Sequence, residues 1–266
     1  MCIRDRVEGA WPLAIAKTES KVLKEGTGEK VDKNATLKVN YVGVNGRTGK
    51  EFDSSYKRGT TADFPLAQVV PGFAKGLVGK HQGDRVLIMM PGSDGYDSQG
   101  GAPQAGIMKG DSLIFVVDIV AIPLPKATGE TVKPAAGLPT VKEVQGAPAV
   151  TIGKATKPNK LVVQPLIKGK GAAVTAHDSI DVKYRTYAWS SGELIEDGYS
   201  AEPVTGSMNS VIPGWKKGLI GQTVGSRVML IVPPADAYPN GSTNPPVKKG
   251  ETLIYVIDIL SAQKES

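Results

Sequence analysis

Cysteine, histidine and long hydrophobic runs are scarce in this sequence, and their scarcity excludes several classes of protein. The 266 residues include one cysteine, which cannot form an intrachain disulfide, and two histidines, His81 and His177. Neither histidine has a second ligand at the spacing of a zinc site, so we expect no metal and no cofactor. No apolar run approaches the roughly 20 residues that cross a bilayer, so we expect no transmembrane segment.

Motifs of nucleophilic and phosphoryl-transfer enzymes are missing as well. The sequence contains no Gly-x-Ser-x-Gly elbow. A glycine-rich stretch spans residues 92–106, but apolar strand residues follow it instead of the Lys and Ser that open a helix after a phosphate loop. Hydrolysis, phosphoryl transfer and redox chemistry therefore have little support.

The net charge of +6 is not gathered on one compact face. Residues 123–160 carry six Lys against two Glu, which is +4, and residues 20–122 carry 13 basic against 11 acidic residues, which is +2. Residues 1–19 and 161–266 are balanced. Because a nucleic-acid interface needs a concentrated basic patch, we do not expect nucleic acid as a partner.

An internal repeat is the strongest signal in the chain. The segment Val-Val-Pro-Gly-Phe-Ala-Lys-Gly-Leu-Val-Gly at 69–79 recurs as Val-Ile-Pro-Gly-Trp-Lys-Lys-Gly-Leu-Ile-Gly at 211–221, with seven identities in eleven. The offset of 142 also relates Arg85 to Arg227 and Tyr96 to Tyr238. Each copy spans about 100 residues, an ordinary domain size, and the sequence predicts two tandem domains.

The repeat sets the predicted boundaries. The first domain covers residues 20–122 and the second covers residues 161–262. Residues 123–160 are rich in Pro and Ala and basic, which is typical of a linker, although Val141, Val144, Val150 and Ile152 could add an edge strand to the second domain. Residues 1–19 form an N-terminal extension whose first six residues are typical of a truncated or foreign start that has lost any targeting segment.

Each copy has the periodicity of an α+β fold. Leu37, Val39 and Tyr41 alternate with polar residues, as do Ile180, Val182 and Tyr184, which predicts half-buried strands. Continuously apolar runs at 86–90, 113–120, 228–232 and 253–260 predict central strands. Segments 71–79 and 213–221 begin with Pro and end with Gly, which predicts two helices of about two turns.

Four ordered motifs carry a resemblance to a known family. Phe52-Asp53-Ser54-Ser55, Val69-Val70-Pro71-Gly72-Phe73, Gly95-Tyr96 and Leu113-Ile-Phe115-Val-Val-Asp118 resemble, in order and spacing, the FKBP-type peptidyl-prolyl cis-trans isomerases. The layout is most similar to tandem enzymes of actinobacterial type. The resemblance implies two domains, each a twisted antiparallel sheet wrapped around one short helix with an apolar pocket between them.

The resemblance also implies the residues of the first pocket. Its catalytic and binding residues would be Tyr41, Phe52, Asp53, Val69, Val70, Phe73, Tyr96, Ile107 and Phe115. Phe73 would seat the proline ring on the floor, where the family usually has Trp. The N–H of Val70 and the hydroxyl of Tyr96 would anchor carbonyl groups, Tyr41 and Asp53 would form a polar rim, and residues 92–106 would be a mobile flap.

The second pocket departs from the family pattern. The corresponding substrate-binding residues are Tyr184, Ile195, Glu196, Val211, Ile212, Trp215, Tyr238, Val247 and Tyr255. Trp215 keeps the usual floor, but Ile195, Glu196 and Tyr255 replace the Phe, Asp and Phe of the family. These replacements favour the first domain as the better isomerase.

Three functions remain open on the sequence. The first is a prolyl isomerase that assists the folding of unfolded or nascent polypeptides, with macrolides as candidate inhibitors. The second is a non-catalytic chaperone or scaffold that binds proline-containing segments, with the second domain as a binding module. The third, a tandem β-sandwich stalk, predicts no helix at 71–79. The basic, Pro-rich connector favours an extracytoplasmic protein anchored through a missing N-terminal segment, and a cytoplasmic location is the alternative.

Overall fold

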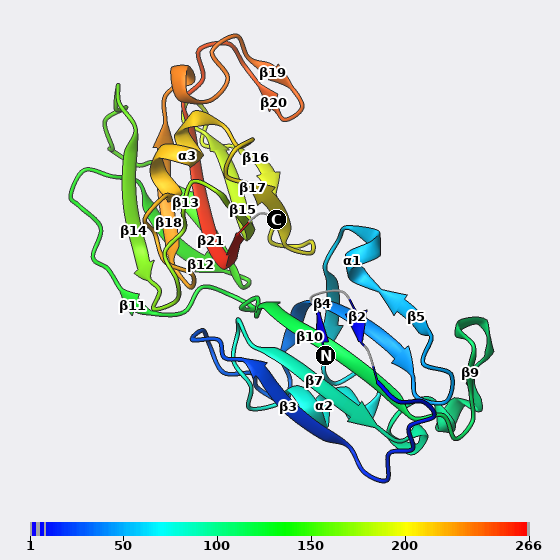
Figure 1. Cartoon of the computed structure of the whole chain (residues 1–266). Coiled ribbons are helices and arrows are strands. Elements are labelled where there is room, and N and C mark those ends of the chain that lie inside the picture. Colours follow the sequence, from blue (N-terminus) through cyan, green and yellow to red (C-terminus); the bar gives the residue numbers. More distant parts are fainter. Residues whose placement is uncertain (1, 4–5, 8, 265–266) are drawn as a thin grey trace. The chain divides into compact units, whose positions relative to one another are not determined.

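The chain folds into two compact units, residues 1–123 and 124–266 (Figure 1). The computed structural model describes residues 2–3, 6–7 and 9–264. Within the predicted N-terminal extension, residues 1, 4, 5 and 8 lie outside the described part. The prediction of a truncated or foreign start falls partly on these residues and stays a prediction. Each unit has its own antiparallel sheet, short helix and hydrophobic core, which confirms the α+β fold predicted from the repeat.

The first unit is built on a six-stranded antiparallel sheet with the order β3-β7-β10-β4-β5 and with β6 paired to β4. Its strands are β1 (Cys2–Ile3), β2 (Arg6–Val7), β3 (Glu19–Lys24), β4 (Thr36–Asn45), β5 (Glu51–Ser54), β6 (Ala62–Pro65), β7 (Arg85–Met90), β8 (Gly101–Ala102), β9 (Ile107–Met108) and β10 (Leu113–Ala121). Its helices are α1 (Ser55–Arg58) and α2 (Pro71–Leu77), and its 3-10 turns are η1 (Gly92–Asp94), η2 (Asp97–Gln99) and η3 (Pro103–Ala105). The predicted strands and the helix after Val70 are therefore present.

Two glycines bring α2 close to the sheet. A Cβ on Gly72 would lie 2.4 Å from the sulfur of Met90, and a Cβ on Gly76 would lie 2.8 Å from the Cδ1 of Ile88. Because both contacts are shorter than real side chains tolerate, only glycine permits this approach of the helix to β7. The approach places the ring of Phe73, between the two glycines, over the core face of the sheet.

The second unit repeats this arrangement in a seven-stranded antiparallel sheet, with the order β11-β14-β18-β21-β15-β16 and with β17 paired to β15. Its strands are β11 (Glu130–Thr131), β12 (Thr140–Val144), β13 (Ala147–Thr151), β14 (Val162–Lys168), β15 (Asp178–Ala188), β16 (Leu194–Asp197), β17 (Val204–Ser207), β18 (Arg227–Val232), β19 (Ser242–Thr243), β20 (Pro246–Val247) and β21 (Leu253–Lys264). Its helix is α3 (Pro213–Leu219) and its 3-10 turn is η4 (Pro234–Asp236). The helices α2 and α3 contradict the β-sandwich hypothesis, which required none.

The segment predicted as a linker differs from that prediction. Residues 124–160 belong to the second unit, and β11 adds to its sheet as the edge strand beside β14. Strands β12 and β13 form a separate hairpin with each other instead of extending the sheet. Leu138, Val141, Val150 and Ile152 pack on Met229, Ile231, Ile254 and Val256, on the face of the sheet away from α3. The apolar residues of this stretch therefore cover a second hydrophobic surface of the sheet. The Pro- and Ala-rich composition of the stretch did not indicate this role.

The helices of the described residues are all short. The longest, α2 and α3, have seven residues each, and among the residues that the structure describes no helix is long and apolar enough to span a bilayer.

Candidate active site

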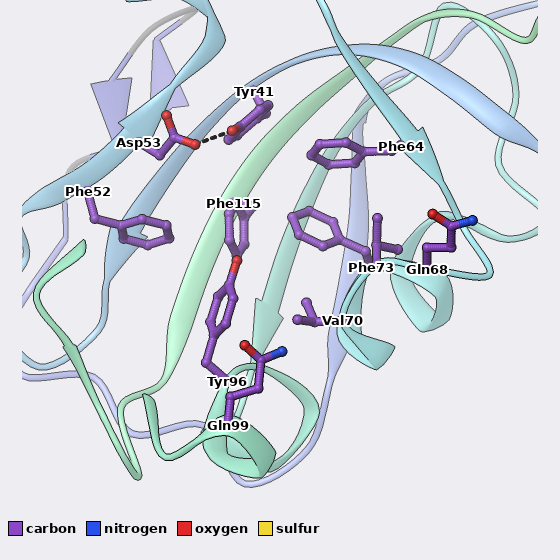
Figure 2. Close-up of a pocket in the computed structure, with 11 residues that line it drawn as sticks. Tyr41, Phe52, Asp53, Phe64, Gln68, Val70, Phe73, Tyr96, Gln99 and Phe115 are labelled. Carbon is purple, nitrogen blue, oxygen red and sulfur yellow. Dashed lines mark hydrogen bonds between the residues drawn. The ribbon is translucent and has the colours of Figure 1, made fainter. Parts of the chain in front are cut away.

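Eight of the nine side chains predicted for the first pocket line one cavity of about 250 Å³ (Figure 2). These residues are Tyr41, Phe52, Asp53, Val69, Val70, Phe73, Tyr96 and Phe115. They come from β4, β5, the segment that enters α2, α2 itself, the loop between η1 and η2, and β10. Sequence positions up to 74 residues apart are thus brought together by the curl of the sheet around the helix.

The floor and walls of this cavity are a cluster of phenylalanine rings. Phe73 from α2 lies with its ring centroid 4.5 Å from that of Phe115 and 4.8 Å from that of Phe64. Phe52 meets Phe115 edge to face at 5.5 Å. Figure 2 shows these rings gathered below Tyr41 and Asp53, with Tyr96 and Gln99 on the opposite side of the cavity. Tilted and edge-to-face contacts of this kind fix the ring positions and leave an apolar hollow between them.

A neutralised carboxylate forms the polar rim of the cavity. The hydroxyl of Tyr41 donates a hydrogen bond to Asp53, and Arg58, at the end of α1, donates to the other oxygen of the same carboxylate. Arg58 also donates to the Tyr41 oxygen at 3.1 Å. The Asp53 carboxylate is therefore ion-paired, and the cation and the tyrosine hold it at the mouth of the cavity.

The ionisation of these groups follows from their contacts. Burial by itself raises the pKa of Asp53, but the hydrogen bonds from Tyr41 and Arg58 outweigh it, and the pKa lies below its usual value. Burial, with the hydrogen bond to Asp53 next, raises the pKa of Tyr41 to about 12. Asp53 is thus a carboxylate and Tyr41 a neutral phenol throughout the physiological range.

Two hydrogen-bond donors at the cavity are free to meet a ligand. Within the part of the chain that the structure describes, the Tyr96 hydroxyl and the N–H of Val70 have no hydrogen-bond partner. Figure 2 shows the Tyr96 side chain reaching toward Phe115, across the cavity from Asp53. Since unpaired donors beside an apolar hollow favour carbonyl oxygens, this arrangement can hold a peptide backbone against the rings.

Sequence reasoning missed four residues of the first site and misplaced a fifth. Phe64, Gln68 and Gln99 line the cavity, and Arg58 binds Asp53 at its rim. Ile107 does not line the cavity; it is buried in the core beneath it, because the short strand β9 turns its side chain inward. The missed residues lie on an isolated edge strand and on turns, where no periodic pattern marks them.

The second unit has a cavity of about 230 Å³ at the corresponding place. Seven predicted residues line it, together with Ser210: Tyr184, Glu196, Val211, Ile212, Trp215, Tyr238 and Tyr255. Trp215 from α3 lies edge to face with Tyr184 at 5.1 Å and with Tyr255 at 5.5 Å between ring centroids. The predictions of Ile195 and Val247 as lining residues are wrong, since both pack into the core cluster of the unit without lining the cavity.

A Gly-to-Thr difference explains how the second cavity holds its carboxylate. By strand register, Gly43 opposite Asp53 corresponds to Thr186 opposite Glu196. A Cβ on Gly43 would lie 2.7 Å from Phe52 and 2.8 Å from Phe115, so the aromatic wall of the first cavity requires glycine there. In the second unit Thr186 is fully buried, and its hydroxyl donates to Glu196 at 2.8 Å.

The second cavity also lacks one aromatic wall. Phe64 pairs with Leu37 across β6 and β4, and Gly206 occupies the corresponding place opposite Ile180. The space beside Trp215 is thus bounded by tyrosines and not by phenylalanine. Its Glu196 accepts a second hydrogen bond, from the hydroxyl of Tyr184 at 3.3 Å.

No cluster of three metal-ligating side chains occurs among the residues that the structure describes. The side chains that line the two cavities offer aromatic rings, hydroxyls and one carboxylate each, and those of the first cavity also offer amides.

Comparison with known proteins agrees with this geometry. A family profile for the FKBP-type peptidyl-prolyl cis-trans isomerases matches residues 27–120 and again residues 170–260. An FK506-binding protein of Streptomyces anulatus is 40% identical over 100 residues, which are 37% of this chain and 80% of that protein. A probable FK506-binding protein of Corynebacterium glutamicum is 35% identical over 97 residues, which are 36% of this chain and 79% of that protein.

Among solved structures, the three FKBP domains of wheat FKBP73 align with 93% of this chain and 95% of their own, at 18% identity and a TM-score of 0.39.

Proposed function

Since the chain belongs to the family of FKBP-type peptidyl-prolyl cis-trans isomerases, we propose that it catalyses the cis-trans isomerisation of X-Pro bonds in unfolded or nascent polypeptides. In this proposal the cavity of the first unit is the main site of catalysis. The observation that carries this assignment is the convergence of four phenylalanine rings beneath an ion-paired carboxylate, beside two free hydrogen-bond donors. The second cavity has a tryptophan floor but lacks the ion pair, and no phenylalanine lines it.

The size of the barrier explains why such a cavity suffices. Rotation about an X-Pro amide faces roughly 18 to 20 kcal/mol and takes tens to hundreds of seconds unaided. A turnover of order ten per second needs about a thousandfold acceleration, or about 4 kcal/mol. No covalent intermediate is required for a gain of this size.

The proposed mechanism is preferential binding of the twisted amide. The planar amide is charge-separated by resonance, and the twisted form loses that resonance, so an apolar surround favours the twisted form. Phe73 seats the proline ring, and Phe52 and Phe115 exclude water from it. The N–H of Val70 and the Tyr96 hydroxyl hold backbone carbonyls on either side of the rotating bond.

Asp53 and its partners orient the rotating carbonyl in this scheme. Tyr41 and Arg58 fix the carboxylate at the rim, where it repels a carbonyl oxygen that would otherwise point toward it. The carbonyl is thereby turned out of the amide plane toward the ring cluster. Because the pKa of Asp53 is lowered, the group keeps its charge in neutral solution.

A matched set of variants tests this assignment in a coupled assay with a proline-containing tetrapeptide and the full chain. The Phe52→Ala and Asp53→Ala variants are expected to lower kcat/KM at least tenfold each, about 1.4 kcal/mol in transition-state binding. The corresponding changes in the second unit, Ile195→Ala and Glu196→Ala, are expected to leave most of the rate. A Phe52→Ala/Asp53→Ala double variant as fast as the unchanged chain would refute the assignment.

A second candidate function concerns the second unit alone. Its altered rim favours a binding module that holds proline-containing segments while the first unit turns them. Two modest sites on one chain raise apparent affinity through effective concentration. Suppression of aggregation of a refolding client by a chain with an inactivated first site would support this role, and loss of suppression together with catalysis would oppose it.

Two further proposals concern a ligand and the location of the protein. The Streptomyces and Corynebacterium relatives are named for binding FK506, and we propose FK506 as a ligand of this chain, which a titration of the isomerase assay with the macrolide would test. The basic stretch 123–160 supports an extracytoplasmic location near an anionic surface, which fractionation of the source cells would test.

A further inference from the structure

The two cavities carry different charge. At the rim of the first, Arg58 neutralises Asp53. At the rim of the second, Glu196 is bound only by two neutral hydroxyls, from Tyr184 and Thr186, and among the residues that the structure describes no Lys, Arg or His forms an ion pair with it. Glu196 is half-buried. Its carboxylate is held by the two hydroxyls, and no described cation balances its negative charge.

The sequence around each carboxylate explains the difference. In the first unit β5 runs directly into α1, which presents Lys57 and Arg58 within five residues of Asp53. In the second unit the structure describes no helix between β16 and β17, and the connecting stretch 198–203 contains Glu202 but no basic residue. Thr186 replaces the missing cation as the group that positions the carboxylate, and it contributes no positive charge.

The negative charge reaches across the second cavity. Burial, and after it the charge of Glu196, raises the pKa of Tyr184 to about 12 and also raises that of Tyr238. Tyr238 comes from the loop after η4, on a different element from Glu196. All three lining tyrosines stay neutral phenols, so among the described residues Glu196 is the one charged group that lines the cavity.

The rings around Glu196 suit a cation as well. Trp215 stands edge to face with Tyr184 and with Tyr255, at interplanar angles of 86° and 89°, and Tyr238 completes the lining. Electron-rich faces of Trp and Tyr attract ammonium and guanidinium groups, and a nearby carboxylate adds to the attraction. Among the described residues the buried indole N–H of Trp215 has no hydrogen-bond partner.

We propose that the second cavity selects proline-containing segments with a Lys or Arg next to the proline, whereas the first cavity is indifferent to that charge. The inference rests on the proposed function in one respect, namely that the second unit binds prolyl segments. The proline ring packs on Trp215, and the cation of the neighbouring residue lies against Glu196 and the tyrosine rings. The two units would then divide the substrates of one chain by charge.

The chain supplies its own reporter for this test. Its three tryptophans are Trp11, Trp189 and Trp215, and the first cavity is lined by none of them. In a full-length Trp11→Phe/Trp189→Phe variant, tryptophan emission reports occupancy of the second cavity alone. The probes are acetyl-Ala-Lys-Pro-Phe-amide and its Leu and Glu analogues.

We expect the Lys peptide to bind about fivefold more tightly than the Leu peptide, and the Glu peptide more weakly than both. Fivefold corresponds to about 1 kcal/mol, the size of a partly exposed ion pair. The preference should shrink in 0.5 M salt, because salt screens a half-exposed pair. Glu196→Gln should bring the Lys peptide to the affinity of the Leu peptide, while Glu196→Asp should keep most of the preference.

Two outcomes would overturn the inference. Equal affinities for the Lys and Leu peptides in the reporter chain would do so, and so would a preference that survives Glu196→Gln. Heats of binding to a chain with unchanged tryptophans and a Phe52→Ala/Asp53→Ala first site provide the same comparison without the Trp substitutions. Binding without charge preference refutes this inference alone, whereas failure of the first unit to catalyse refutes the proposed function and leaves the charge preference intact.

Discussion

The two units share a sheet order, a seven-residue helix and a cavity at the same place, yet they surround the same kind of carboxylate differently. The first unit pairs Asp53 with Arg58 and lines its cavity with phenylalanine. The second holds Glu196 with Thr186 and lines its cavity with tyrosine and tryptophan. The comparison teaches that the fold fixes where the carboxylate lies, while the turn after it and the residue opposite it decide which groups hold it.

The units differ on the other face of the sheet too. Strand β7 alternates buried and half-buried residues, whereas every residue of the corresponding strand β18 is buried. The hairpin β12-β13 accounts for this, because it covers the outer residues of β18. The smaller cluster on the outer face of the first unit consists of Val42, Val44 and Val116 with Trp11 and Leu87. The second unit is thus a three-layer structure and the first has only a partial cover.

Converting the first cavity toward the second should have the largest effect. Gly43→Thr places a side chain where Phe52 and Phe115 already lie, and the overpacked wall must shift. We expect kcat/KM for a Leu-Pro tetrapeptide to fall about thirtyfold, close to 2 kcal/mol. The reverse change, Thr186→Gly, serves as the control and should leave the total rate nearly unchanged. A Gly43→Thr chain with full activity would show that the aromatic wall is dispensable.

The hairpin cover offers the next test. Val150→Asp puts a charge against the outer face of the second sheet and should destabilise that unit by about 2 kcal/mol, with the first unit unaffected. Calorimetry on the full chain would show one of two transitions moving to lower temperature. Val144→Asp, on the same hairpin but 51% exposed, is the matched control. Equal effects of the two changes would mean that the hairpin does not stabilise the sheet by apolar packing.

Removing the cation from the first rim should make that rim resemble the second. Arg58→Ala removes a hydrogen bond and a positive charge that lower the pKa of Asp53. Burial, which raises this pKa, remains, so the pKa rises. Because the carboxylate must be charged, activity is lost as pH falls through this pKa, which lies below the usual value of an aspartate in the unchanged chain and is higher in the variant. At neutral pH we expect about a fivefold loss for a Leu-Pro substrate. Coincident pH profiles of the two chains, measured at equal substrate, would contradict the role of Arg58.

The smallest predicted difference concerns one hydroxyl in each unit. Ser112 accepts a hydrogen bond from the N–H of Ile15 at 2.9 Å. In the second unit the corresponding hydroxyl, that of Thr252, is buried and has no hydrogen-bond partner among the described residues. Glu19 pairs with Met89 and Val162 pairs with Ile231, so Glu19 corresponds to Val162. Four residues earlier, Ile15 therefore corresponds to Pro158, which has no N–H to donate.

Ser112→Ala should therefore cost about 1 kcal/mol of unfolding free energy, whereas Thr252→Val should be neutral or slightly stabilising. Denaturant titration would compare the two variants. A Thr252→Val change as costly as Ser112→Ala would mean that the threonine hydroxyl has a partner.

Much of the fold and of the site could be predicted because the repeat and the period-two patterns are local signals. The strands around Tyr41 and Tyr184 and the helices after Val70 and Ile212 follow from residue spacing. Convergence of Phe52, Phe73 and Phe115 followed from the resemblance, since nothing in their spacing alone requires it.

The other features of the fold and the site depend on contacts between residues that follow no periodic pattern in the sequence. Arg58 lies in a one-turn helix, and only the folded turn brings it back to Asp53. The hairpin 140–151 was concealed by its Pro- and Ala-rich neighbours, although the apolar residues on both faces of β18 already required a cover on the second face. The lining role predicted for Ile107 and Val247 is wrong because two-residue strands gave no reliable indication of side-chain direction.

Exchange NMR on a proline peptide tests the central claim most directly. A small amount of full-length chain is added to acetyl-Ala-Leu-Pro-Phe-amide, and exchange peaks between the cis and trans forms are recorded at mixing times of about a second, where the unaided reaction gives none. We predict that these peaks persist in Trp215→Leu and vanish in Phe73→Leu, with amide spectra that show both chains folded. Peaks that survive Phe73→Leu and vanish in Trp215→Leu would place catalysis in the second unit and contradict the account.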